Sequence, residues 1–243
     1  MPLVYNRAFV QHGQHPEPAS GLLTRDPNVE EPTDVAVKTN LDLIAANGCV
    51  RAVRRIDINV HCLTNPFPGW REAIQRIGSV ATRWRVVELM VAMHPRSRRF
   101  EARNVDMAKF ADDIAEVGDA LAALMPDVRR LDCRGEFEEP FAGSVCGRLA
   151  RPLYGRLAVH YADQLQVFNS IHPITVPRDC QFPRLKKFSA NYERIAGYQL
   201  PQMASGELVD VCLLNGSSNH SWASFSADSD SQVIEFTKLK KLK

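Results

Sequence analysis

Cysteine and histidine are the residues of this sequence best suited to metal binding and redox chemistry, and their spacing supports neither. None of the six cysteines forms the C-x-x-C pair that zinc ribbons and disulfide oxidoreductases need. The seven histidines include no H-E-x-x-H motif. Most cysteines stand beside Val, Leu or Phe, so we expect small buried apolar side chains in a reducing compartment.

Nucleophiles and phosphate-binding loops are also missing from the sequence. Ser144 lies in G-S-V-C-G, which lacks the G-x-S-x-G spacing of a nucleophile elbow. No G-x-x-x-x-G-K loop and no G-x-G-x-x-G turn occurs. Acids such as Asp112 and Asp113 fit the solvated face of a helix. We therefore expect no enzyme, no catalytic residue, no cofactor and no metal site.

Composition narrows the possible partners. The chain has 243 residues, 45% hydrophobic and 24% charged, with a formal net charge of +2. These values are typical of a globular chain, and a near-neutral balance argues against a dedicated nucleic-acid binder. No apolar run approaches the roughly 18 residues of a membrane span, and residues 1–15 do not resemble a signal peptide. We expect an intracellular protein, cytoplasmic or nuclear, that binds neither nucleic acid nor membranes.

One short pattern recurs along the chain: apolar, two variable residues, apolar, one variable residue, apolar. Its copies begin at Val53, Val86, Val128, Leu165, Leu185, Leu208 and Leu239, with a possible earlier copy at Tyr5. This is the strand half of a leucine-rich repeat, L-x-x-L-x-L. On a strand its last two apolar positions point to one face. The copies start 20 to 42 residues apart, whereas regular repeats run about 20–29 residues, so the early repeats need insertions.

Between the copies the apolar residues recur with helical spacing. We expect helices over residues 40–47, 70–83, 107–125 and 152–164. Pro152 suits a first helical turn and Gly48 a C-terminal cap. The alternation predicts an α/β fold, an irregular leucine-rich-repeat solenoid with a parallel sheet on the concave side and helices on the convex side. The buried strand positions would include Ile56, Ile58, Leu89, Val91, Leu131, Phe188, Val211 and Leu213.

The organisation along the chain is that of one domain, residues 1–243. Residues 11–32 hold four of the fifteen prolines and residues 215–231 are rich in Ser and Asn, so we expect a surface loop at each. The copy at Leu239 is cut off by the C-terminus, and nothing ahead of the first strand would cover it. We therefore expect a truncated last repeat, open at both ends, in a fragment of a longer protein or a shortened gene copy.

The third and fifth positions of each strand would face away from the core. The third positions are Arg55, Glu88, Arg130, Val167, Lys187, Asp210 and Lys241, and the fifth are Asp57, Met90, Asp132, Asn169, Ser189 and Cys212. If the strands stack in order, the third positions form two ladders of alternating charge, each neighbouring pair contributing about 0.2–1 kcal/mol.

Two interpretations of these ladders remain open. They either only align and solubilise the sheet, or belong to a concave surface that binds a protein partner, as solenoids commonly do. In the second case the partner contacts would be Arg55, Asp57, Glu88, Met90, Arg130, Asp132, Lys187 and Asp210. Reversing the charge at Glu88 or Arg130 would then weaken partner binding.

Several segments carry a resemblance to a known family. Seven segments are similar to segments of fungal F-box/leucine-rich-repeat proteins: MPLVYNRAFVQ, VRRIDINV, NPFPGWREAIQ, VVELMVAMHP, ALMPDVRRLDC, YADQL and GYQLPQMASGELVDVCLLNG. The resemblance implies the substrate-recognition arm of a cullin-type ubiquitin ligase, in which an F-box docks on the ligase core and the repeats choose the target. The F-box itself would precede Met1, so contact with the ligase core is expected only if an F-box is supplied upstream.

Taken together, the sequence favours a non-enzymatic protein–protein interaction module of leucine-rich-repeat type, with an unidentified protein partner. Two alternatives stay open. One is the substrate-recognition arm of an F-box-type ubiquitin ligase. The other is an uncharacterised α/β enzyme, for which a pocket gathering several titratable residues with shifted pKa values would be evidence.

Overall fold

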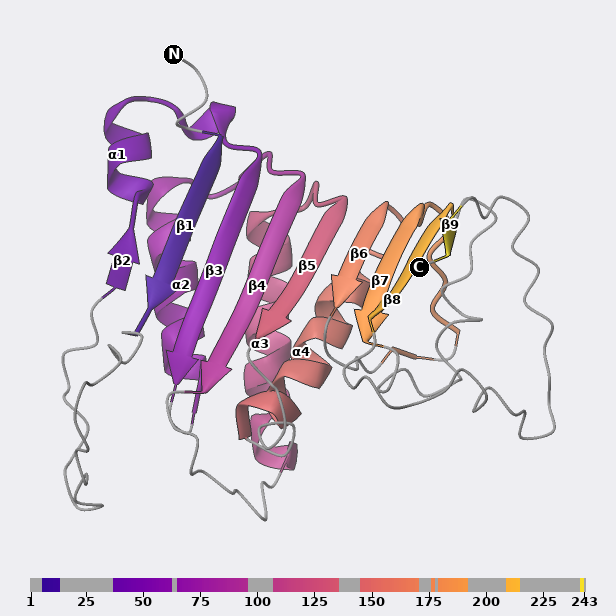
Figure 1. Ribbon diagram of the computed structural model, residues 1–243. Helices are drawn as coiled ribbons and strands as arrows, with labels where there is room; N and C mark the ends of the chain where they lie inside the picture. The colour runs from indigo at the N-terminus through magenta and orange to yellow at the C-terminus, as the bar shows by residue number, and fades with distance from the viewer. Residues whose placement is uncertain are drawn as a thin grey trace, which may run out of the picture.

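The computed structural model of the chain describes residues 6–13, 37–62, 65–95, 107–135, 145–170, 176–177, 179–191, 209–214 and 241–242 (Figure 1). Its helices are α1 (Leu41–Ala46), α2 (Phe67–Val80), α3 (Ala111–Leu124) and α4 (Val145–His160), with 3-10 turns at Val50–Ala52 and Met107–Phe110. Its strands are β1 (Arg7–His12), β2 (Val37–Thr39), β3 (Arg55–Cys62), β4 (Glu88–Pro95), β5 (Arg130–Gly135), β6 (Val167–Ser170), β7 (Lys187–Asn191), β8 (Asp210–Leu214) and β9 (Lys241–Leu242).

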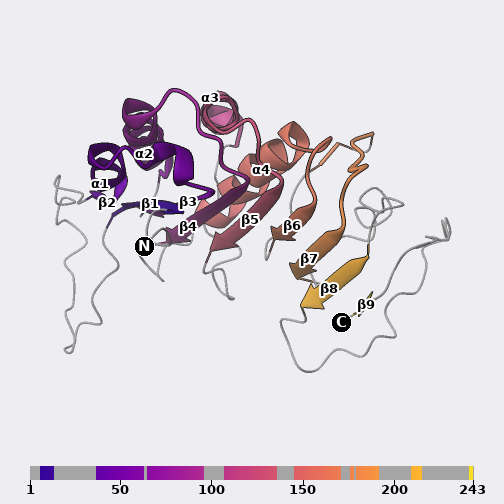
Figure 2. The ribbon, with the colours of Figure 1, turned by 90° about the horizontal axis from the view of Figure 1, so that it is seen from above.

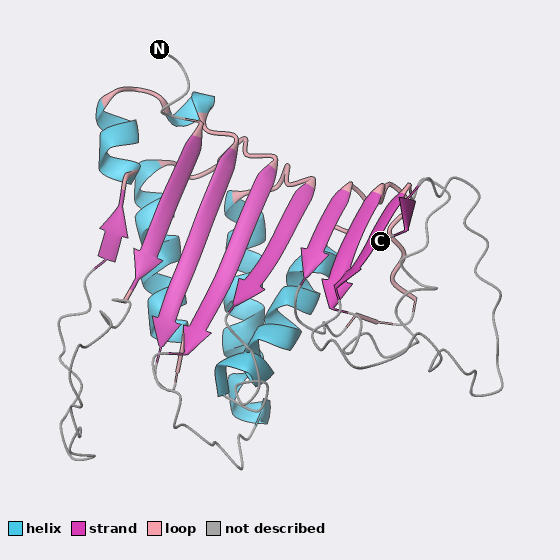
Figure 3. Cartoon of the chain, in the orientation of Figure 1, coloured by secondary structure: helices cyan, strands magenta, loops and turns pink. Residues whose placement is uncertain are grey.

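The described strands form one sheet of nine, in the order β2-β1-β3-β4-β5-β6-β7-β8-β9. Every neighbouring pair is parallel except β1 and β2. The register places equal positions of the sequence pattern side by side, so that Ile56 lies opposite Leu89 and Leu89 opposite Leu131. The prediction of one continuous parallel sheet in chain order is therefore confirmed from β1 onwards (Figure 3).

The helices α1 to α4 all lie on one side of the sheet (Figure 2). No described helix covers the opposite side, which we call the bare face and which carries Arg55, Asp57 and the side chains in register with them. Beyond β5 the sheet turns away from the helix layer, so that the bare face lies on the inner side of the bend. The chain is thus an α/β protein with a mostly parallel sheet and helices on one side.

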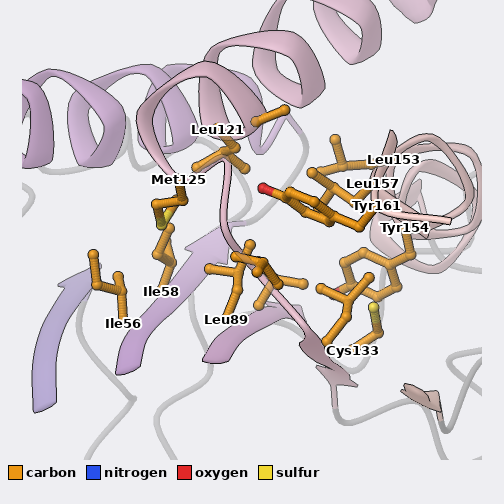
Figure 4. Close-up of a cluster of buried hydrophobic side chains, with 14 of the residues drawn as sticks. Ile56, Ile58, Leu89, Leu121, Met125, Cys133, Leu153, Tyr154, Leu157 and Tyr161 are labelled. Carbon is orange, nitrogen blue, oxygen red and sulfur yellow. The ribbon is translucent and has the colours of Figure 1, made fainter. Parts of the chain in front are cut away.

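The core lies between the sheet and the helix layer (Figure 4). Six of the predicted strand positions are buried in it: Ile56, Ile58, Leu89, Val91, Leu131 and Phe188. The other two, Val211 and Leu213, lie in β8, and their side chains are outside the described set. From the helix side the core receives Leu121 of α3 and Leu153 and Leu157 of α4. Each such side chain contributes about 1.5–3 kcal/mol when fully buried.

The helix ends depart from the sequence expectation most clearly in α4. This helix starts at Val145, so Pro152 lies inside it and not in its first turn. Proline lacks the N–H that would bond to the carbonyl four residues earlier, which weakens a helix. However, Leu149 and Ala150 on the N-terminal side of Pro152 are fully buried, as is Leu153 after it. Burial of this stripe against the sheet offsets the lost hydrogen bond.

The remaining helices are close to the predicted ones. Gly48 has a φ of 63° and follows α1 as its C-terminal cap, with its N–H bonded to the Ala45 carbonyl at 3.0 Å. The helix expected from residue 107 begins with a 3-10 turn and becomes α-helical at Ala111. Helix α2 starts three residues earlier than expected, at Phe67.

The N-terminal edge of the sheet corrects a second expectation, since β1 is not left open. β2 pairs antiparallel with it, with Val10 opposite Thr39. Directly after β2, the Asn40 side chain continues the contact with β1. It accepts a hydrogen bond from the Phe9 N–H at 2.9 Å and donates one to the Arg7 carbonyl at 3.0 Å. A segment that follows β1 in the chain therefore closes this edge.

The two predicted surface loops fall largely outside the described residues. Gln11 and His12, the first two residues of the loop expected at 11–32, instead belong to β1. His12 is buried there, and its Nε2 lies 3.2 Å from a carboxylate oxygen of Glu72 in α2. Residues 14–32 and 215–231 lie outside the described part of the chain. At the other edge, Lys241 and Leu242 pair with β8, as the copy of the pattern at Leu239 predicts.

Tyr154 of α4 and Tyr161, in the turn directly after α4, both face the core, but their hydroxyl groups differ in hydrogen bonding (Figure 4). The Tyr154 hydroxyl accepts a hydrogen bond from the Met93 N–H at 3.1 Å and donates one to the Arg134 carbonyl at 2.8 Å, which ties α4 to β4 and β5. The Tyr161 hydroxyl is buried and has no hydrogen-bond partner within the described residues, and burial raises its pKa.

This contrast predicts different outcomes for the same substitution. Tyr154→Phe should lower the free energy of unfolding by about 1–3 kcal/mol, because it leaves two buried backbone groups without a partner. Tyr161→Phe should leave stability unchanged or raise it, since it removes a buried hydroxyl that makes no bond. Urea unfolding followed by circular dichroism measures both. Equal losses in the two variants would contradict the arrangement around α4.

Candidate binding surface

Two rows of side chains cross the bare face. In the first row Arg7, Arg55, Glu88 and Arg130 stand side by side on β1, β3, β4 and β5. In the second, two residues further along each strand, stand Phe9, Asp57, Met90, Asp132 and Asn169 on β1, β3, β4, β5 and β6. The third and fifth positions of the sequence pattern therefore do align across the sheet as predicted.

Two carboxylates of the second row are buried although no described helix covers them. Asp57 and Asp132 are each 1% exposed. The Arg7 guanidinium donates to one oxygen of Asp57, and the Arg55 Nε donates to the other at 2.6 Å. Burying a carboxylate costs several kcal/mol unless cations and hydrogen bonds compensate it, which the two arginines do here.

Asp132 also lies among arginines, but at longer distances. Its Oδ2 lies 3.5 Å from the Arg130 Nε and 3.9 Å from guanidinium nitrogens of Arg55 and Arg134. Its Oδ1 accepts a hydrogen bond from the Asn169 side chain. The two aspartates are thus linked through Arg55, which contacts both. We call these residues the arginine cluster: Arg7, Arg55, Arg130 and Arg134 with Asp57, Glu88 and Asp132.

Arg55 is the centre of this cluster. Its side chain also lies 3.6 Å from a carboxylate oxygen of Glu88. Burial lowers the pKa of Arg55, but the hydrogen bond to Asp57 and the charges of Asp57, Asp132 and Glu88 outweigh it, so the pKa is raised above its ordinary value. Arg55 therefore stays charged and serves as the fixed cation between the acids.

The structure brings together six of the eight residues proposed from the sequence as partner contacts: Arg55, Asp57, Glu88, Met90, Arg130 and Asp132. Lys187 and Asp210 form a separate pair at 3.9 Å, further along the sheet on β7 and β8. The charge ladder predicted in the first row has an ion pair between Arg55 and Glu88, whereas Arg130 pairs with Asp132, two residues further along its own strand.

Four residues of this surface were not among the proposed contacts: Arg7, Phe9, Arg134 and Asn169. Arg7 is the third position of the possible copy at Tyr5, so carrying the pattern one repeat further back would have found it. Arg134 lies two residues beyond the fifth position of its strand, still on the bare face. The burial of Asp57 had no signal in the sequence, because it results from arginines of two strands closing over it.

The cysteines whose side chains are described contribute no reactive group to this surface. Cys133 is buried, and burial together with the charge of Asp132 raises the pKa of its thiol well above the ordinary value. The thiol is therefore protonated and inert, as expected for a small buried side chain. Cys49 and Cys180 are half-buried and, like Cys133, unpaired. The side chains of Cys62, Cys146 and Cys212 lie outside the described set.

The described residues also offer no metal site and no membrane-spanning helix. Within the described ranges, no group of three or more His, Cys, Asp or Glu side chains is placed to hold a metal ion. None of the helices described is long and apolar enough to cross a membrane.

Comparisons of the chain with protein-family models, with curated proteins and with solved structures find no match. The likeness to F-box/leucine-rich-repeat proteins is therefore carried by the residues of the chain alone, and its functional implications remain predictions.

Proposed function

We propose that this chain is a leucine-rich-repeat solenoid that acts as a protein–protein interaction module and not as an enzyme, with the bare face as its contact surface. The partner is a protein, and neither a nucleic acid nor a membrane takes part. Such modules stack strand–helix units so that the strands line a concave surface.

The strand arrangement supports the solenoid part of the proposal. From β3 to β5 each strand is followed by one helix and pairs with the next strand in the chain. The backbone links between units also recur: the Arg54 carbonyl accepts from the Val87 N–H, and the Val87 carbonyl from the Arg129 N–H, each at 2.9 Å. A repeated unit in a repeated register is what a leucine-rich repeat requires.

The arginine cluster is the observation that carries the functional part. Arginine and aromatic side chains are enriched in protein interfaces, and the bare face combines Phe9 with the four arginines, whereas Met90 in the same row is buried. Stability alone does not account for this composition, because a solvated sheet face needs no buried carboxylates under a layer of arginines.

Affinity capture from the protein's own cells tests the proposal. We expect Arg130→Gln to reduce recovery of bound proteins, because it removes a charge from the cluster without placing a new carboxylate beside Asp132. The matched control is Arg156→Gln on the helix side. Arg156 has similar exposure and pairs with Asp119 at 2.6 Å, so this variant loses the same charge at a different surface.

The proposal holds if a partner is lost with Arg130→Gln and retained with Arg156→Gln, while both variants keep the circular dichroism spectrum of the wild type. Loss with Arg156→Gln alone would assign binding to the helix side and refute it. Recovery of cullin-type ligase subunits with the wild-type chain would extend the module to the substrate-recognition arm that the sequence resemblance implies.

A further inference from the structure

In the arginine cluster two arginines are exposed to solvent, whereas the two aspartates are buried. The side chains of Arg7 and Arg134 are 58% and 57% exposed, whereas those of Asp57 and Asp132 are 1% and 2% exposed. Glu88, at 36%, is the one acid of the cluster with substantial exposure. A molecule approaching β1 to β5 of the bare face therefore meets guanidinium groups first.

The acids beneath also orient the arginines. Arg7 and Arg55 donate hydrogen bonds to the two oxygens of Asp57, whereas Arg55, Arg130 and Arg134 lie 3.5–3.9 Å from one oxygen of Asp132 in looser ion pairs. Each guanidinium has five N–H donors, so nitrogens that do not face an aspartate stay available. Side chains ordered in advance lose less entropy on binding than free ones. Four arginines over three acids leave a net positive, preorganised surface.

An exposed aromatic ring lies beside these cations. Phe9 is 38% exposed and follows Arg7 by two residues on the same face of β1. The other large apolar side chains recorded as exposed among the described residues, Leu43 and Val159, belong to helices on the opposite side of the sheet. Aromatic and arginine side chains are the residue types that most often carry binding energy at interfaces.

We propose that the bare face over β1 to β5 binds an acidic segment of the partner protein, whose carboxylates contact the outward nitrogens of Arg7, Arg130 and Arg134 and whose apolar residue contacts Phe9. This inference rests on the proposed function and names the chemistry of the partner. Arg–carboxylate pairs are charge-assisted and often bidentate. Exposed guanidinium groups therefore recognise planar carboxylates better than negative charge without a fixed geometry. The effect expected at Glu88 is then opposite to the one predicted from the sequence. Removing this acid strengthens binding, because it removes repulsion of an acidic partner.

Fluorescence anisotropy with synthetic peptides tests the inference. The probes are a fluorescein-labelled decaglutamate, the same peptide with leucine at position five, a decalysine and a ten-nucleotide single-stranded RNA. Arg134→Gln is the main variant, since Arg134 is exposed and its only described ion pair is a loose one of 3.9 Å to Asp132. Arg76→Gln on α2 is the matched control, with 52% exposure and a 3.9 Å pair to Glu72.

We expect the wild type to bind decaglutamate and not decalysine, and Arg134→Gln to weaken that binding about tenfold, the equivalent of one charge-assisted hydrogen bond. Arg76→Gln should bind as the wild type does, and Glu88→Gln as tightly or more tightly. The leucine-containing peptide should bind more tightly than decaglutamate, and Phe9→Ala should abolish that difference.

Three outcomes would overturn the inference. The first is decaglutamate binding that Arg76→Gln weakens as much as Arg134→Gln does. The second is tighter binding of the RNA than of decaglutamate, which would assign the surface to a nucleic acid. The third is no binding of decaglutamate while cellular capture still depends on Arg130. In that case the interaction function stands and the acidic chemistry of the partner is wrong.

Discussion

Leu121→Ala should lower the free energy of unfolding by about 2–5 kcal/mol, the usual cost of a leucine-sized cavity in a packed core. Leu121 is fully buried in α3, on the side of the helix that faces the sheet. The removed methyl groups lie between a helix and a sheet that other contacts hold in place, so the cavity cannot close completely.

Leu43→Ala is the matched control for this prediction. It deletes the same atoms from an α1 side chain that is 54% exposed, so we expect a change within about 0.5 kcal/mol. Asp113 is less suitable as a surface control, because its carboxylate pairs with Arg71 of α2. Urea unfolding followed by circular dichroism would contradict the assigned core if both leucine variants shifted the midpoint equally.

Asp57→Asn should be the most destabilising isosteric change on the bare face, at about 1.5–3 kcal/mol. It keeps the shape of the side chain but removes the charge that Arg7 and Arg55 share. Arg7 is largely exposed and water can take over its solvation, whereas Arg55 is mostly covered and keeps only Glu88 and Asp132 nearby. The loss therefore comes chiefly from Arg55.

Asp119→Asn provides the exposed counterpart. Asp119 also accepts two hydrogen bonds from one arginine, Arg156, and that contact lowers its pKa, but the pair lies on the outer surface of α3 and α4. Exposed pairs contribute little, so this variant should unfold close to the wild-type midpoint. If Asp119→Asn and Asp57→Asn proved equally destabilising, burial would not distinguish the arginine cluster from an ordinary surface ion pair.

The sequence predicted the sheet well because its signal is local and repeated. Two apolar positions per strand, spaced two apart, were enough to assign Ile56 and Ile58 to the core side and Arg55 and Asp57 to the other. The same spacing aligned the strands, since parallel neighbours with the same pattern bury their apolar pairs only in one register.

The features that the sequence did not predict depend on contacts between distant segments. The start of α4 was placed at Pro152, because local rules favour proline in a first turn, but burial of Leu149 extends the helix backwards. The closure of β1 by Asn40 joins residues about thirty positions apart. The burial of Asp132 likewise needs side chains from β3, β5 and β6 together.

Site-specific photo-crosslinking tests most directly whether the bare face is the contact surface. A benzoylphenylalanine at Phe9 probes the bare face, and one at Val159 probes the helix side at nearly the same exposure, 38% against 37%. After irradiation in extracts of the protein's own cells, the interaction module predicts a discrete protein adduct from position 9 that Arg130→Gln diminishes, and none from position 159. An adduct from position 159 alone, or equal adducts from both positions, would contradict it.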